Sequence, residues 1–211
     1  AGLPGEHAVG MQVRQSRLRA VLGLPGGGLL GDAKLKGLVE IDFMGGSVGG
    51  DASLPLVRLR HAWAAATWKD LGNLTLTVGQ TWGVFTGPYF ATSLGHLALP
   101  RFAGAGFLYR RAPQLRLAGD VGGEVAVRWD AALLAPMDKG TVPAGSVPSG
   151  AGVGERSGVP DVEGRLAVVY RPQKKNMVEL GLSAHYGQDK YVLTGNLNKT
   201  IPSQGMAVDL K

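Results

Sequence analysis

The chain alternates apolar and polar residues over short stretches, and glycine, proline or asparagine bounds most of them. Residues 33–43 show the pattern clearly, because Leu35, Val39 and Ile41 alternate with charged residues. Successive side chains of a β-strand point to opposite faces, so this period predicts strands with one apolar and one polar face. The alternation predicts about eight strands, at residues 16–24 and 33–43, twice within 56–82, and at 114–120, 124–131, 163–170 and 178–186.

The connections between these strands alternate in length. Long connections rich in Gly, Pro and Ser separate short turns, and outer-membrane barrels place short turns at one rim and long loops at the other. The sequence therefore predicts one all-β domain over residues 1–211, an antiparallel up-and-down transmembrane β-barrel. The short turns are expected at 25–32, 69–73, 119–123 and 171–176, and the long loops at 44–55, 82–107, 135–160 and 187–205.

Aromatic residues help to decide what surrounds this barrel, because alternation alone fits a soluble barrel as well as a membrane barrel. Trp63, Trp129, Tyr170 and Tyr186 lie near predicted strand ends. An aromatic belt at the bilayer interfaces has this placement. We therefore expect the apolar face to contact outer-membrane lipid and the charged face to line a lumen.

The order of the connections bears on the extent of the barrel. The first short turn follows the first strand, so that strand runs towards the periplasm, whereas single-chain barrels start there. We therefore expect a further strand before Ala1. At the other end, "GMAVDLK" begins a new alternating run. The sequence predicts an interior piece of a larger barrel, incomplete at both ends.

Composition excludes several other classes of protein. The chain has 34 glycines and no cysteine, which removes disulfide frameworks, Cys-based zinc sites and thiol nucleophiles. The net charge is +6, but the basic residues are scattered, whereas nucleic-acid binding needs a contiguous stripe. No apolar run reaches the ~18 to 20 residues of a membrane helix. No metal-ligand spacing, cofactor motif or catalytic grouping stands out, so we predict no cofactor, no metal and no catalytic residue.

The charged face carries the candidate functional residues. One interpretation makes them cross-strand ion pairs, and the other makes the basic excess a ladder that attracts anions, as Arg and Lys do in anion pores. Arg165 shares this face, and the opposing acids are Glu40, Asp42, Asp120, Glu124, Asp130, Glu163 and Glu179. The predicted pore-lining residues are Arg17, Arg19, Lys34, Lys36, Arg58, Arg60, Arg116 and Arg128.

Five short motifs follow one another along the first half of the chain: "RQSRLRAVL" (14–22), "GLVEIDFMGG" (37–46), "VRLRHAWA" (57–64), "VGQTWGVF" (78–85) and "RRAPQLRL" (110–117). In order and spacing they resemble the DcaP-like porins of Gram-negative outer membranes. The resemblance spans about residues 14–120 and lies in the succession of short motifs. It implies a trimeric, roughly sixteen-stranded passive diffusion channel with a basic constriction and a preference for anionic solutes.

The connection over residues 82–111 is too long and too aromatic for a simple solvated loop, and such loops are usually functional or disordered. Its length and the resemblance favour a constriction loop that folds into the barrel, with Arg101, Arg110 and Arg111 near the narrowest point. A trimer contact or an outer lid is the alternative.

These observations lead to one functional hypothesis and two competitors. We expect a bacterial outer-membrane porin, a homotrimer that passes small, preferentially anionic solutes and is not an enzyme. The competitors are an outer-membrane barrel enzyme with a site at the rim and a structural or adhesive surface protein.

Overall fold

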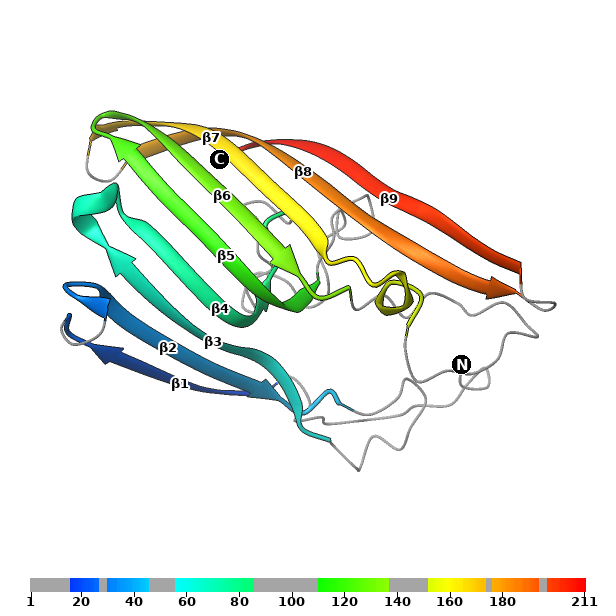
Figure 1. Cartoon of the computed structure of the whole chain (residues 1–211). Helices are drawn as coiled ribbons and strands as arrows, with labels where there is room; N and C mark the ends of the chain where they lie inside the picture. The colour runs from blue at the N-terminus through cyan, green and yellow to red at the C-terminus, as the bar shows by residue number, and fades with distance from the viewer. Residues whose placement is uncertain are drawn as a thin grey trace, which may run out of the picture.

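The strands follow one another in a single antiparallel sheet, each hydrogen-bonded to the next along the chain (Figure 1). A computed structural model describes residues 16–26, 30–45, 56–85, 110–136, 152–173, 176–193 and 197–211. The strands are β1 (Arg17–Leu24), β2 (Lys34–Asp42), β3 (Arg58–Trp68), β4 (Leu74–Trp82), β5 (Arg111–Gly122), β6 (Val125–Leu134), β7 (Asp161–Gln173), β8 (Asn176–Leu193) and β9 (Leu197–Leu210).

The helical elements that lie wholly within the described residues are two short 3₁₀ turns, η2 (Lys69–Leu71) and η4 (Glu155–Ser157). The predicted all-β antiparallel fold is therefore confirmed, with nine strands where about eight were expected. Among the described residues, no helix has the length and apolar character needed to cross a membrane.

Residues 187–205 were wrongly predicted to form a long loop. β8 continues to Leu193, and β9 begins at Leu197. The two strands pair without interruption from the Tyr186–Gln204 pair to the Leu193–Leu197 pair. Polar residues there remove the alternation that marks a strand, although the backbone pairing continues. The β8–β9 hairpin thus extends past the end of β7, as Figure 1 shows.

The β3–β4 turn shows how the local sequence sets a short connection. Gly72 (φ 67°) and Asn73 (φ 53°) both adopt left-handed backbone conformations, which suit glycine and asparagine. The N–H of Asp120 donates to the carbonyl of Gly72 at 2.9 Å, which ties this turn to the end of β5. The sequence "LGN" therefore closes this hairpin tightly.

The two faces of the sheet have the opposite polarity from a soluble protein. Large apolar side chains are exposed on one face, the apolar face, with Leu22 at 63 % and Leu166 at 57 %. Charged side chains are buried on the other, the charged face, where Glu40, Glu163 and Glu179 are each 1 % exposed. Soluble proteins almost never bury such residues while exposing a continuous leucine and valine surface.

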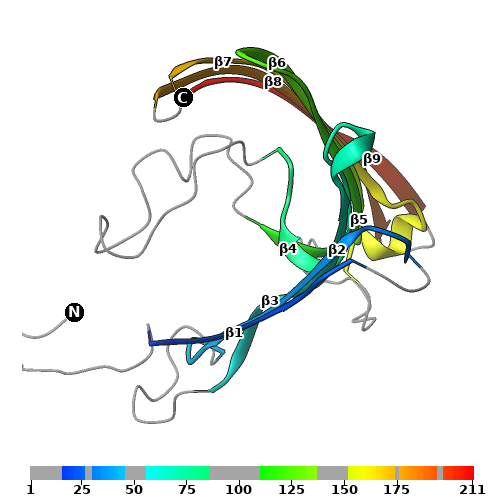
Figure 2. The same ribbon diagram turned by 90° about the vertical axis from the view of Figure 1, so that its left-hand side faces the viewer.

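The sheet curves strongly about its long axis, and the chain leaving β4 lies on the concave side (Figure 2). Phe85, at the end of that segment, contacts Glu163 and His185 on the charged face, so the charged face is the concave one. β1 and β9 form the two edges of the sheet and do not pair with each other in the described part of the chain. We call this open, curved sheet the wall.

Three of the four predicted belt aromatics lie on the apolar face. Tyr170 and Tyr186 are 45 % and 41 % exposed there, and Trp129 packs over Gly119, where a Cβ would come within 2.6 Å of the indole Nε1. Trp63 is the exception, because its partner in register is Leu38 on the charged face. The prediction for Trp63 was therefore wrong, and a β-bulge described below explains why.

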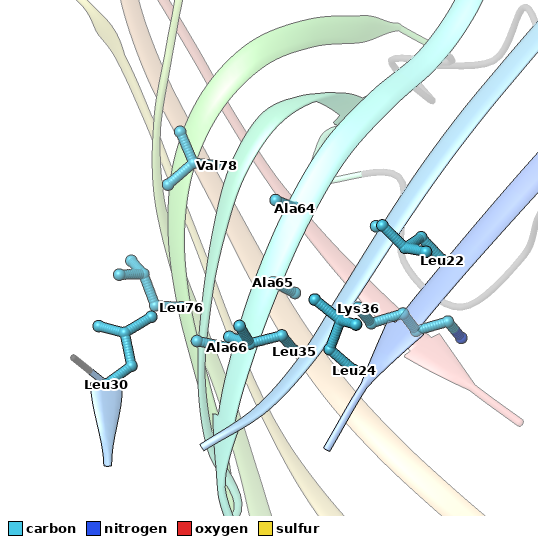
Figure 3. Close-up of a pocket in the computed structure, with 11 residues that line it drawn as sticks. Leu22, Leu24, Leu30, Leu35, Lys36, Ala64, Ala65, Ala66, Leu76 and Val78 are labelled. Atoms are coloured by element: carbon cyan, nitrogen blue, oxygen red, sulfur yellow. The ribbon is translucent and has the colours of Figure 1, made fainter. Parts of the chain in front are cut away.

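A hollow of about 360 Å³ lies on the N-terminal part of the sheet beside the β1–β2 turn (Figure 3). Its lining is almost wholly apolar. The small side chains of Ala64 and Ala66 on β3 form the centre of the hollow, and leucines such as Leu22 and Leu35 rise around it. The hollow therefore results from small residues flanked by large ones.

Candidate pore-lining face

A register shift in β3 shapes the N-terminal half of the charged face. Glu40 lies opposite His61 and Ile41 lies opposite Leu59, so Arg60 is an extra residue in β3, a β-bulge. The side-chain amide of Gln80 donates to the carbonyls of Leu59 at 3.0 Å and of Arg60 at 3.4 Å, which satisfies the backbone that the bulge frees. Because of this extra residue, each side chain of β3 after Arg60 points to the face opposite the one that strict alternation from Arg58 would give.

The bulged Arg60 joins two buried carboxylates. Its Nε lies 2.7 Å from Oε1 of Glu40, and its Nη1 lies 2.8 Å from Oδ2 of Asp42. Arg58 binds Asp42 with two hydrogen bonds of 2.9 and 2.6 Å, and Arg19 Nε binds Glu40 Oε2 at 2.6 Å. Three predicted pore-lining arginines are thus engaged in one ion-pair cluster across β1, β2 and β3.

A second cluster connects β5 to β9. Its arginines and carboxylates alternate, so that each charge has a partner of opposite sign on the next strand or on the strand after that. Arg116 pairs separately with Asp130. The other contacts are Arg171 to Asp120 at 2.5 Å, Arg128 to Asp120 at 3.2 Å and to Glu179 at 2.8 Å, and Arg165 to Glu179 at 2.6 Å and to Asp209 at 2.5 Å.

Glycine makes room for one of these arginines. A Cβ at Gly181 would lie 2.3 Å from an Nη of Arg165. The guanidinium therefore lies flat against β8 as it reaches Asp209 on β9. Arg165 is only 8 % exposed, and its partners Glu179 and Asp209 are also buried.

Three of the predicted pore-lining cations differ from the rest. Arg17, Lys34 and Lys36 are exposed, and none has a carboxylate partner among the described residues. They lie on β1 and β2, whose charged face offers only the carboxylates of Glu40 and Asp42. The excess of positive charge is therefore concentrated on β1–β3, whereas the arginines on the charged face of β5–β9 are matched by carboxylates.

Both ends of the long connection after β4 are attached to the wall near β7 and β8. The N–H of Phe85 donates to Oε2 of Glu163 at 3.0 Å, and Arg110 Nη2 lies 2.6 Å from Oδ2 of Asp161 and 3.6 Å from Oε1 of Glu163. His185 Nδ1 lies 3.2 Å from Oε1 of Glu163, and the Phe85 and His185 rings are 5.9 Å apart. We call these residues, Phe85, Arg110, Asp161, Glu163 and His185, the latch.

Glycine again permits the approach, because a Cβ at Gly83 would lie 2.6 Å from Oε2 of Glu163. The segment that leaves β4 must pass over two intervening strands to reach β7. Neighbouring strands lie about 4.8 Å apart, so this segment crosses roughly 15 Å of the sheet. The ends of the connection therefore cross the concave side rather than running along the rim.

The three arginines predicted near the constriction separate in the structure. Arg110 belongs to the latch. Arg111 places its guanidinium 4.6 Å from the ring centroid of Trp82, a cation–π contact, and Trp82 makes an edge contact with His61 at 5.8 Å. Arg101 lies outside the described residues.

The sequence did not single out the latch acids. Glu163 was grouped with the wall acids, and Asp161 was not considered although it shares the parity of Glu163 on β7. Extending the alternation of residues 163–170 by one pair would have placed Asp161 on the charged face. The pairing with Arg110 had no sequence signal, because the two residues are far apart in the chain.

Within the described ranges, no three His, Asp or Glu side chains gather in a way that could hold a metal ion.

The wall shares its fold with an outer-membrane channel. It is similar to the crystal structure of the outer membrane channel DcaP of Acinetobacter baumannii, with a TM-score of 0.55 and 17 % sequence identity. The similarity covers 94 % of this chain and 47 % of that chain, so this chain spans about half the length of the channel. No family model and no curated protein sequence matches the chain.

Proposed function

We propose that this chain forms part of the wall of a passive outer-membrane channel for small hydrophilic solutes, with anions preferred. The inverted polarity of the sheet carries this proposal. An exposed face of leucine, valine and tyrosine suits contact with lipid, and a concave face of charges suits a water-filled lumen. The fold shared with an outer-membrane channel supports the same conclusion.

The preference for anions rests on the three cations that have no carboxylate partner among the described residues. Arg58 and Arg60 hold Asp42 and Glu40, so much of their charge is neutralised within the wall. Arg17, Lys34 and Lys36 remain to attract an anion along β1 and β2. Arg116 and Arg128 line the same lumen in this proposal, but as members of ion pairs.

The constriction is proposed where the latch crosses the concave side. Phe85 and Arg110 are held against β7 and β8, so both ends of the connection narrow the lumen from within. Arg111 over Trp82 adds a cation at the base of the same connection. The resemblance to DcaP-like porins also supports a homotrimer, which chemical cross-linking in outer membranes would test as a trimer band lost on boiling.

Bilayer electrophysiology of the full protein tests the channel. We expect stepwise conductance in planar bilayers and a reversal potential in a potassium chloride gradient that shows chloride permeating better than potassium. A protein that inserts into bilayers without conducting would refute the channel. Conductance with preference for potassium would refute only the anion preference.

One observation favours the alternative of a barrel enzyme. His185 lies between Glu163 and Ser203, with Nδ1 3.2 Å from the carboxylate and Nε2 3.5 Å from the hydroxyl. Serine hydrolases use this order of groups. Glu163 also binds Phe85 and Arg110, so the latch accounts for its burial. Hydrolysis of a simple acyl ester that disappears in Ser203→Ala and persists in Ser157→Ala would favour the enzyme.

A further inference from the structure

A row of apolar residues interrupts the charged face on its N-terminal side. Its members face one another in register across four strands, and directly opposed residues of an antiparallel pair point to the same face. Two of them lie two positions along their strands from Arg19 and Glu40, which pair on the charged face. We call this the apolar row: Val21 of β1, Leu38 of β2, Trp63 of β3 and Gly79 of β4.

The apolar row offers room above its surface. Val21 is 57 % exposed. Gly79 has φ 123°, and a Cβ at this position would lie 2.2 Å from the carbonyl oxygen of Ala62, so the row ends at a residue that cannot carry a side chain. Ala65 lies next to Trp63 on the same face of β3. Gly79 and Ala65 therefore leave two sides of the indole of Trp63 without a large neighbour among the described residues, while His61, two residues earlier on the same face of β3, lies on a third side.

A cation stands beside this surface. Lys36 lies two residues before Leu38 on β2, shares its face, is exposed and has no carboxylate partner among the described residues. Lys36 lies opposite Ala65, which makes it a diagonal neighbour of Trp63. Diagonal neighbours are about 7 to 8 Å apart, within reach of long and aromatic side chains. A flat apolar surface thus adjoins a free ammonium group.

We propose that the apolar row and Lys36 form a binding subsite for aromatic monocarboxylates, in which Trp63 and Leu38 contact the ring and Lys36 binds the carboxylate. The proposal rests on the channel function and names a class of solute for it. A small aliphatic anion such as acetate gains only the charge contact. An aromatic anion such as benzoate gains a ring contact as well, which favours it about two- to tenfold.

The test compares benzoate with acetate in the full protein. Reversal potentials in planar bilayers give the benzoate-to-acetate permeability ratio, and quenching of tryptophan fluorescence in detergent gives benzoate binding without requiring a channel. Trp63→Ala should lower the ratio and the affinity about two- to tenfold, whereas Trp63→Phe should retain most of both. Trp129→Ala, which removes a tryptophan from the apolar face, is the matched control and should change neither.

The outcomes separate this inference from the channel proposal. An anion-selective channel whose ratio and benzoate affinity are the same in wild type and Trp63→Ala refutes the subsite and leaves the channel standing. An equal loss in Trp129→Ala also refutes it. A protein that does not conduct but binds benzoate through Trp63 refutes the channel and supports the subsite. Lys36→Gln should weaken benzoate and acetate alike, and a loss confined to benzoate would overturn the role given to Lys36.

Discussion

Replacing Arg60 with glutamine should destabilise the wall strongly while leaving the lumen chemistry nearly intact. The Arg60 side chain is 9 % exposed and links Glu40 and Asp42, whose side chains are 2 % and 1 % exposed. Removing one partner from a buried ion pair costs about 3 to 5 kcal/mol, because an uncompensated charge stays buried. Glu40 keeps Arg19 and Asp42 keeps Arg58, so we expect the lower end, about 3 kcal/mol.

Reversing the charge of these arginines should destabilise the wall more than neutralising Arg60 does. On sequence grounds alone, replacing Arg58 and Arg60 together with glutamate would leave the barrel folded and change only its selectivity. The structure predicts otherwise, because four carboxylates would then crowd one cluster. Two like charges about 4 Å apart repel by about 4 kcal/mol at an effective dielectric constant of 20. The double reversal should therefore prevent folding rather than report on selectivity.

Urea unfolding of the refolded full protein, followed by tryptophan fluorescence, measures these effects. Lys36→Gln is the matched control. Lys36 is exposed and has no carboxylate partner in the part of the chain that the structure describes, so its replacement should change stability by no more than about 0.5 kcal/mol. Combining Arg60→Gln with Glu40→Gln should cost less than the sum of the single changes, by about 1 kcal/mol or more, because the two residues are in contact. A loss below about 0.5 kcal/mol for Arg60→Gln, or strict additivity, would refute the reasoning.

Three further outcomes are expected. Lys36→Gln should lower the chloride-to-potassium permeability ratio in bilayers, and an unchanged ratio would remove Lys36 from the solute path. Gly181→Val should lower the free energy of unfolding in urea by at least about 2 kcal/mol, because the new side chain would displace Arg165. Gly164→Ala should be tolerated, because the nearest atom to its Cβ would be 3.7 Å away. Equal losses of stability in the two variants would contradict this packing. Glu163→Gln should make single-channel currents noisier by weakening the latch, and currents as quiet as those of the wild type would show that the latch does not hold the constriction.

The strands could be predicted from sequence because each needs only local information. An amphipathic strand shows its two faces within a few residues, so eight of the nine were found this way, and the ninth was found only in its C-terminal part, "GMAVDLK". The β8–β9 hairpin shows the limit. Its outer part pairs by backbone hydrogen bonds while Gln188 to Tyr191 carry no apolar period, so the pattern ends before the strands do.

The position of Trp63 shows how one residue can invert a prediction. Strict alternation from Arg58 places Trp63 on the face of Leu59, which is the apolar face. The bulge at Arg60 adds one residue and turns everything after it to the opposite face. Nothing local in "RLRHAW" marks the bulge. It is fixed by partners on β2 and β4, the carboxylates of Glu40 and Asp42 and the amide of Gln80.

The same cross-strand information separates two kinds of arginine and lysine that look alike in the sequence. A cation between two carboxylates contributes little net electric field to the lumen, because the negative charges in contact with it cancel most of its field. A cation that has no carboxylate partner among the described residues attracts anions over a Debye length of about 8 to 10 Å. Arg60 and Arg165 are of the first kind, and Lys34 and Lys36 are of the second. Selectivity should therefore follow the position of the unmatched lysines rather than the number of basic residues, and the preferred path for an anion should lie along β1 and β2.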